Sequence, residues 1–99
     1  MKTTFTARHF DPSTDLHRYS EEAVQKLDQF FDQIVSCDIV LEPSASNETP
    51  FKAELNLKIP QKLLHTTSRS SSYEQAINEA VETMGRQLKN YINKHFKNY

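Results

Sequence analysis

The chain has 99 residues and a mass of 11.5 kDa, enough for one hydrophobic core, so we expect residues 1–99 to form a single domain. Hydrophobic residues make up 36% and charged residues 25% of the sequence, which excludes collagen-like, low-complexity and disordered classes. No apolar run could cross a bilayer, and residues 1–6 lack the apolar stretch of a signal peptide. We therefore expect a cytoplasmic protein with no membrane partner.

The charges are distributed unevenly. Twelve basic and thirteen acidic residues give a net charge of −1, so the whole-chain charge does not indicate a nucleic-acid-binding protein. Up to residue 60 there are six Lys or Arg against ten Asp or Glu, whereas residues 83–99 contain four basic residues and no acidic one. The C-terminal end is therefore a local positive pole.

The first two predicted elements are a strand and a helix. Phe5 and Ala7 indicate a strand over residues 2–8. Over residues 13–34, apolar side chains recur every three or four positions, which predicts an amphipathic helix. Residues 11–14 read Asp-Pro-Ser-Thr, a sequence suited to capping the first turn of that helix.

Three strands are expected next. Apolar and polar residues alternate over residues 37–42 and most clearly over residues 51–59, with the polar loop 43–50 between them, so this pair should form a hairpin. A fourth strand is predicted over residues 62–69. Cys37, the only cysteine, cannot form an internal disulfide and is interpreted as buried packing.

A second helix is predicted from about Ser72 to near the C-terminus. Ser71 and Glu74 have the spacing of a capping box, in which the side chain of each residue accepts a hydrogen bond from the backbone N–H of the other. Gly85 interrupts the helix and should be explained by a close packing contact.

The order strand, helix, three strands, helix predicts an α+β fold of βαβββα type. Each helix has one apolar stripe, so both should cover the same face of a four-stranded sheet. The first strand, first helix and second strand can form a right-handed crossover, and the remaining strand connections should be antiparallel. The other face of the sheet should stay in water.

No catalytic or metal-binding motif is evident. The four histidines are scattered without ligand spacing, and a chain with one glycine has no glycine-rich phosphate loop. No nucleophile has a recognisable signature. We therefore expect no catalytic residues, no metal, no cofactor and no small-molecule substrate. A small enzyme would need a concave site with converging polar groups.

The best functional candidates are four cations on the polar side of the second helix: Arg86, Lys89, Lys94 and Lys97. The structural alternative is that cations near a helix C-terminus complement the macrodipole, with Glu82 and Arg86 forming an ordinary i, i+4 pair. Charge alone leaves both interpretations open.

The outer face of the sheet also carries cations. Acidic residues dilute them there, so this face is interpreted as solvated surface. The cations are Lys2, Arg8, Lys52, Lys58, His65 and Arg69, and the acids are Asp38, Glu42 and Glu54.

Three segments together resemble a known family. They are Thr-Ala-Arg-His at residues 6–9, KLDQFFDQI at residues 26–34 and SYEQAINEAVETMGRQLK at residues 72–89. Their order and spacing resemble the short ribosome hibernation factors, also called ribosome-associated inhibitor, protein Y or sigma factor modulation proteins. The resemblance spans nearly the whole chain, and with an end at Tyr99 it implies the short form, without a C-terminal ribosome-pairing domain or a polar tail.

This resemblance implies a fold akin to a double-stranded RNA-binding domain. It also implies docking in the decoding channel of the small ribosomal subunit, where the protein contacts ribosomal RNA and blocks mRNA and tRNA. The implied RNA-binding residues are Arg8, Lys26, Arg86 and Lys89, with Lys94 and Lys97 extending the basic side of the second helix. Recognition would be of phosphates and shape.

Several positions depart from the family pattern. Ala23, Gln29 and Gln33 stand where family members commonly have basic residues. Fewer phosphate contacts predict weaker binding with a shallower salt dependence. A protein-interaction module on the same fold, with little or no RNA affinity, is therefore the alternative function, and it would have a protein partner.

Overall fold

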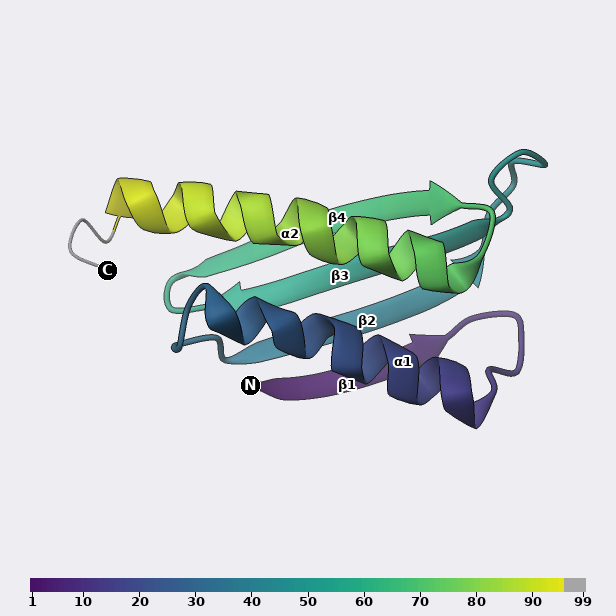
Figure 1. Ribbon diagram of the computed structural model, residues 1–99, viewed down its shortest axis with the longest axis horizontal. Helices are drawn as coiled ribbons and strands as arrows, with labels where there is room; N and C mark the ends of the chain where they lie inside the picture. Colours follow the sequence, from purple (N-terminus) through teal and green to yellow (C-terminus); the bar gives the residue numbers. More distant parts are fainter. Residues whose placement is uncertain (96–99) are drawn as a thin grey trace.

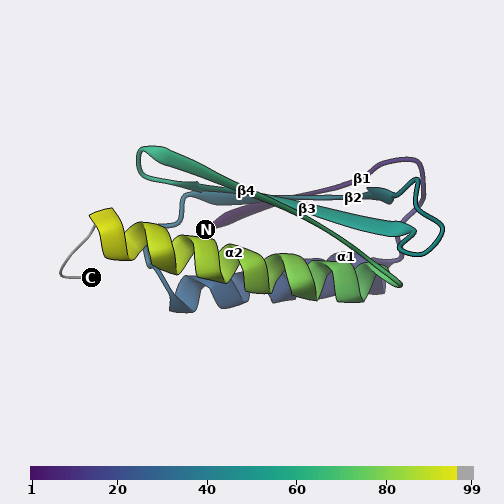
Figure 2. The same ribbon diagram turned by 90° about the horizontal axis from the view of Figure 1, so that it is seen from above.

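The computed structural model describes residues 1–95. One four-stranded sheet, in the order β1-β2-β3-β4, is covered on one face by two helices (Figures 1 and 2). The strands are β1 (Lys2–Ala7), β2 (Ser36–Pro43), β3 (Phe51–Ile59) and β4 (Lys62–Ser70), and the helices are α1 (Thr14–Gln25), the 3₁₀ turn η1 (Lys26–Gln29) and α2 (Tyr73–His95). The predicted βαβββα order and α+β class are confirmed.

The sheet is mixed, because β1 pairs with β2 in parallel while β2–β3 and β3–β4 are antiparallel. In β3, residues at alternate positions are fully buried, and the intervening residues lie on the opposite face. The predicted hairpin between β2 and β3 is confirmed. Between β3 and β4 the chain reverses through Pro60 and Gln61. The φ of Gln61, 66°, lies in the left-handed region.

The first helix is shorter than predicted. Ser13 caps α1 by accepting a hydrogen bond from the Leu16 N–H at 3.0 Å, as expected, but α1 ends at Gln25 and tightens into η1. The predicted helix over residues 13–34 is therefore wrong beyond residue 29. Phe31 and Ile34 are still buried, and they are reached by an irregular segment that brings the chain back to β2. Apolar spacing predicted their burial but not their backbone conformation.

The capping of α2 also differs from the prediction. The hydroxyl of Ser72 accepts from the backbone N–H of Gln75 at 3.1 Å, while the Ser71 hydroxyl donates to Oε1 of Gln75 at 2.9 Å. The predicted pair of Ser71 and Glu74 is thus wrong by one position. Ser72 and Gln75 have the same spacing, and Ser72 is the residue directly before the first helical residue, Tyr73.

The core lies between the sheet and the helices, with α2 packed on β3 and β4 and α1 on β1 and α2. A Cβ atom at Gly85 would lie 3.1 Å from Cε2 of Phe30, so the predicted close contact exists and involves the segment after η1. Cys37 is fully buried, as expected, and its burial raises the pKa of the thiol to about 12. Among residues 1–95, no helix combines the length and apolar character that crossing a membrane requires.

Candidate nucleic-acid interface

An open groove of about 590 Å³ runs between α1–η1 and α2. It is lined by Tyr19, Lys26, Gln29, Phe30, Asn78, Val81, Glu82, Gly85, Arg86 and Lys89. The two helices lie side by side on the same face of the sheet (Figures 1 and 2), so residues separated by about 60 positions face one another across it. We call this feature the interhelix groove.

Two contacts define the ends of the interhelix groove. At one end, Nδ2 of Asn78 donates to the hydroxyl of Tyr19 at 2.7 Å, which ties α2 to α1. At the other end, Nζ of Lys89 lies 5.5 Å from the centroid of the Phe30 ring, a cation–π distance. Between these ends the floor is apolar, because Val81 and Gly85 lie along the side of α2 that faces α1.

The rim of the groove is basic, with Lys26, Arg86 and Lys89 against one carboxylate, Glu82. Nη1 of Arg86 lies 3.1 Å from Oε1 of Glu82, and its Nη2 donates to the Thr83 hydroxyl at 3.3 Å. The i, i+4 pair expected from the sequence is therefore present. Within residues 1–95, Lys26 and Lys89 form no ion pair with a carboxylate. These two ammonium groups can meet an anion without first leaving a carboxylate.

The structure brings together three of the six predicted site residues: Lys26, Arg86 and Lys89. Lys94 is exposed on α2 but does not line the groove. Lys97 lies outside the described residues. The periodicity of the second helix predicts these cations on one polar side. In the structure Arg86 and Lys89 line the groove, whereas Lys94 lies outside it.

Arg8 lies elsewhere, directly after β1, where its backbone N–H donates to the Leu41 carbonyl at 2.8 Å. Two residues later, the ring of Phe10 stacks on Tyr73, the first residue of α2, with a centroid distance of 4.6 Å. Arg8 is therefore near the start of α2, whereas Arg86 is thirteen residues along it, or about 20 Å at the rise of an α-helix.

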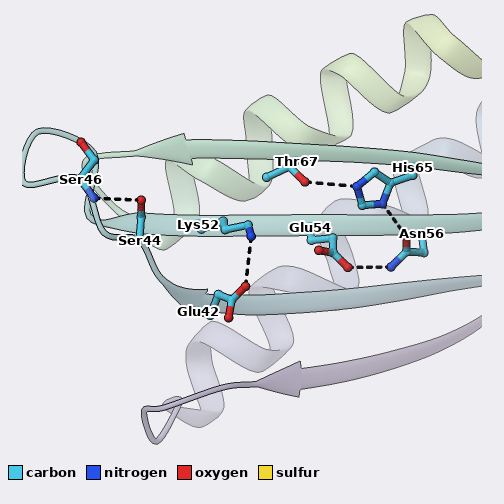
Figure 3. A network of polar contacts seen from close by, with 8 residues as sticks. All are labelled: Glu42, Ser44, Ser46, Lys52, Glu54, Asn56, His65 and Thr67. Atoms are coloured by element: carbon cyan, nitrogen blue, oxygen red, sulfur yellow. Dashed lines mark hydrogen bonds and ion pairs between the residues drawn. The ribbon is translucent and has the colours of Figure 1, made fainter.

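Several polar side chains on the outer face of the sheet contact one another (Figure 3). Nζ of Lys52 lies 3.1 Å from Oε1 of Glu42, and this hydrogen bond lowers the pKa of the Glu42 carboxyl. Asn56 donates to Glu54 at 3.1 Å and contacts Nδ1 of His65 at 2.7 Å. Among residues 1–95, Lys52 is the only cation of this face that forms an ion pair, so Lys2, Arg8 and Lys58 carry positive charge without a carboxylate partner there. The interpretation of this face as solvated surface stays a prediction.

Sequence reasoning missed the aromatic part of the site. Tyr19 and Phe30 were assigned to the apolar stripe of the first helix, yet both are only partly buried and line the interhelix groove. Gln29 and Asn78 were not singled out as site residues. The available signal was an aromatic residue four positions after Lys26, an interleaving of basic and aromatic side chains typical of nucleic-acid surfaces.

Among residues 1–95, the groups whose pKa values are shifted lie outside the groove. Burial raises the pKa of Tyr73, with a further contribution from the Glu42 charge, and the other shifted groups are Cys37 and Glu42. The polar groups that line the groove are suited to binding through charge and hydrogen bonds.

Comparison with known proteins supports the same family as the sequence resemblance. Residues 3–95 match the family described as Sigma 54 modulation protein / S30EA ribosomal protein. A ribosome hibernation promotion factor from Deinococcus radiodurans is 23% identical over 94 residues, which are 93% of this chain and 49% of that protein. The chain thus spans about half the length of this curated relative.

Two solved structures share the fold. The N-terminal domain of Protein Y from Thermus thermophilus has a TM-score of 0.79 at 21% identity, covering 92% of this chain and 99% of that chain. A ribosomal subunit interface protein from Coxiella burnetii has a TM-score of 0.81 at 19% identity, covering 92% of this chain and 97% of that chain. With the family match over residues 3–95, these findings show that the chain belongs to the Sigma 54 modulation protein / S30EA ribosomal protein family.

Proposed function

We propose that this chain is a ribosome-associated hibernation factor that inhibits translation in the cytoplasm. It binds ribosomal RNA of the small subunit in the decoding channel and blocks mRNA and tRNA there. Residues 1–99 act as one RNA-binding domain, by stoichiometric binding and without catalysis or a cofactor. The observation that carries the proposal is the basic rim of the interhelix groove, in a chain whose family and curated relative are named for the ribosome and its hibernation.

Phosphate contacts supply the affinity in this proposal. Lys26 and Lys89 are free of carboxylate partners within residues 1–95, and Arg86 can exchange the carboxylate of Glu82 for a phosphate. Each phosphate contact releases counterions, so binding should weaken as salt rises. Arg8, Lys94 and Lys97 extend the contact beyond the groove.

The test is co-sedimentation of the protein with isolated small subunits over a salt series from about 50 to 200 mM. The variant K26Q/R86Q/K89Q removes the three rim charges while keeping long polar side chains. We expect its affinity to fall by about tenfold or more and its salt dependence to flatten by roughly two to three units of log K per log salt.

A matched control is K2Q/K58Q/K62Q, which removes the same number of charges from exposed positions outside the groove. It should bind nearly as the wild type does. Equal loss in both triple variants would contradict a localised interface. If the wild type does not bind small subunits at low salt, the proposal fails, and a protein-interaction module with a protein partner becomes the better assignment.

A further inference from the structure

We infer that the interhelix groove holds one unstacked nucleobase of a single-stranded RNA segment, packed against Phe30, with the flanking phosphates on the basic rim. This inference rests on the proposed function and specifies what part of an RNA the groove binds. Phosphate recognition needs only exposed cations, whereas this groove combines the cations with an apolar, aromatic floor.

The shape and lining of the groove suit a planar ring. Its volume of about 590 Å³ lies within the range of about 300 to 1,000 Å³ typical of small-molecule sites. Phe30 lines this groove and also a second hollow lined by Asp32 and Ile92, so its side chain is an aromatic wall shared by the two hollows. Stacking on such an aromatic wall is how proteins bind unpaired bases.

Gly85 makes room for the ring of Phe30 beside α2. A Cβ there would approach Cε2 of Phe30 to 3.1 Å, and a longer side chain would extend into the space between the helices. A glycine within a helix is unfavourable relative to alanine, so the position of the Phe30 ring against α2 is maintained at some expense of helix stability.

The polar groups are placed for the rest of a nucleotide. Three cations face one carboxylate on the rim, and that carboxylate is already paired with Arg86 at 3.1 Å, so the rim favours an anion. Lys89, 5.5 Å from the Phe30 centroid, can turn from the ring to a phosphate when a base takes its place. The side-chain amide of Gln29, the residue next to Phe30, also lines the groove, and because an amide both donates and accepts, it can hydrogen-bond a base edge without requiring one particular base.

The experiment separates stacking from charge by comparing two probes with the same phosphates. One is hexaadenylate, and the other is an equally long oligomer of reduced, stable abasic ribose units. For the wild-type protein at low salt, fluorescence anisotropy should give about tenfold tighter binding of hexaadenylate. The variant F30L should lose this preference while keeping its affinity for the abasic oligomer and its salt slope. K26Q should weaken both probes equally.

A second measurement does not depend on how well Phe30→Leu folds. The sequence has no tryptophan, so Phe30→Trp introduces a single reporter. Hexaadenylate should quench its emission, and the abasic oligomer should not.

Equal wild-type affinity for the two probes, or no binding of either, overturns the inference even when salt-sensitive co-sedimentation with small subunits is observed, so the proposed function survives on its own. Loss of co-sedimentation in the wild type overturns both. If neither probe binds but an apolar or acidic peptide does, the groove is a peptide site and the inference is wrong.

Discussion

At the scale of single residues, Arg86 forms an ion pair with Glu82 before any RNA is bound. Its guanidinium contacts Glu82 at 3.1 Å, and both side chains are more than half exposed. We expect Glu82→Gln to raise the affinity for small subunits by about two- to fivefold, because the charge of Arg86 is then available and one repulsive carboxylate is gone. Co-sedimentation at fixed salt measures the gain.

The matched control is Glu79→Gln, which removes an exposed carboxylate from the same helix outside the groove. Net charge changes equally in the two variants. If both gain equally, general charge explains the effect and the pairing of Arg86 has no role in binding.

Cys37 gives a prediction on pH. Burial holds the pKa of its thiol at about 12 in the folded protein, against an ordinary value of 9.0. Because the folded pKa is raised, this group's contribution to stability is present below about pH 9 and is lost as the pH rises toward 12. Between about pH 9 and pH 10.5, the free energy of unfolding should fall by up to about 1.4 kcal/mol per pH unit from this group.

Urea unfolding over that pH range measures the slope, with Cys37→Ala as the comparison. The alanine variant should be less stable below about pH 9 because a cavity is left, and its slope above that pH should be shallower than that of the wild type. Parallel slopes would show that the pKa of Cys37 is not raised in the folded protein.

At the scale of elements, the two neighbouring serines before α2 have different roles. Ser72→Ala should lower the free energy of unfolding by about 1 kcal/mol, because the N–H of Gln75 loses its acceptor at 3.1 Å. Ser71→Ala should cost only a few tenths of a kcal/mol, since Ser71 contacts the exposed side chain of Gln75 and no backbone group. Thermal or urea unfolding of both variants measures the two losses of stability. A larger loss for Ser71→Ala than for Ser72→Ala would support Ser71 as the cap.

The strands were predictable because a half-buried strand has apolar and polar residues at alternate positions, as β3 does. The end of α1 was not. Phe31 and Ile34 are buried either from a helix or from an irregular return segment, and apolar spacing is the same in both cases. The prediction of the capping serine was wrong for a related reason. Ser71 and Ser72 are adjacent and both can cap a helix, so only the position of the first helical residue decides which of them does.

At the scale of the whole molecule, the site was predictable only in part. Lys26, Arg86 and Lys89 were identified individually, but their meeting across one groove depends on how closely α1 and α2 approach. That spacing is set where Phe30 meets Gly85, a contact between distant parts of the chain. Arg8 and Lys94 were grouped with them in sequence reasoning, and the fold puts both outside the groove.

The separation of Arg8 from the groove predicts additivity. Arg8→Gln should weaken binding to small subunits by a similar factor in the wild type and in K26Q/R86Q/K89Q, because Arg8 lies outside the groove and its charge acts on Glu42, which does not line the groove. Co-sedimentation of Arg8→Gln, of K26Q/R86Q/K89Q and of their combination completes this double-mutant cycle. A large deviation from additivity would mean that Arg8 contacts the same RNA segment as the groove.

The parallel pairing of β1 has a consequence for the order in which the molecule assembles. Lys2 meets Ser36, 34 positions later, so this pairing must close a long loop that contains α1, whereas β2, β3 and β4 are joined by short hairpins. β1, the first of the four strands in chain order, is then expected to be among the last to dock. The position of Arg8, just beyond that strand, is fixed only when folding is nearly complete.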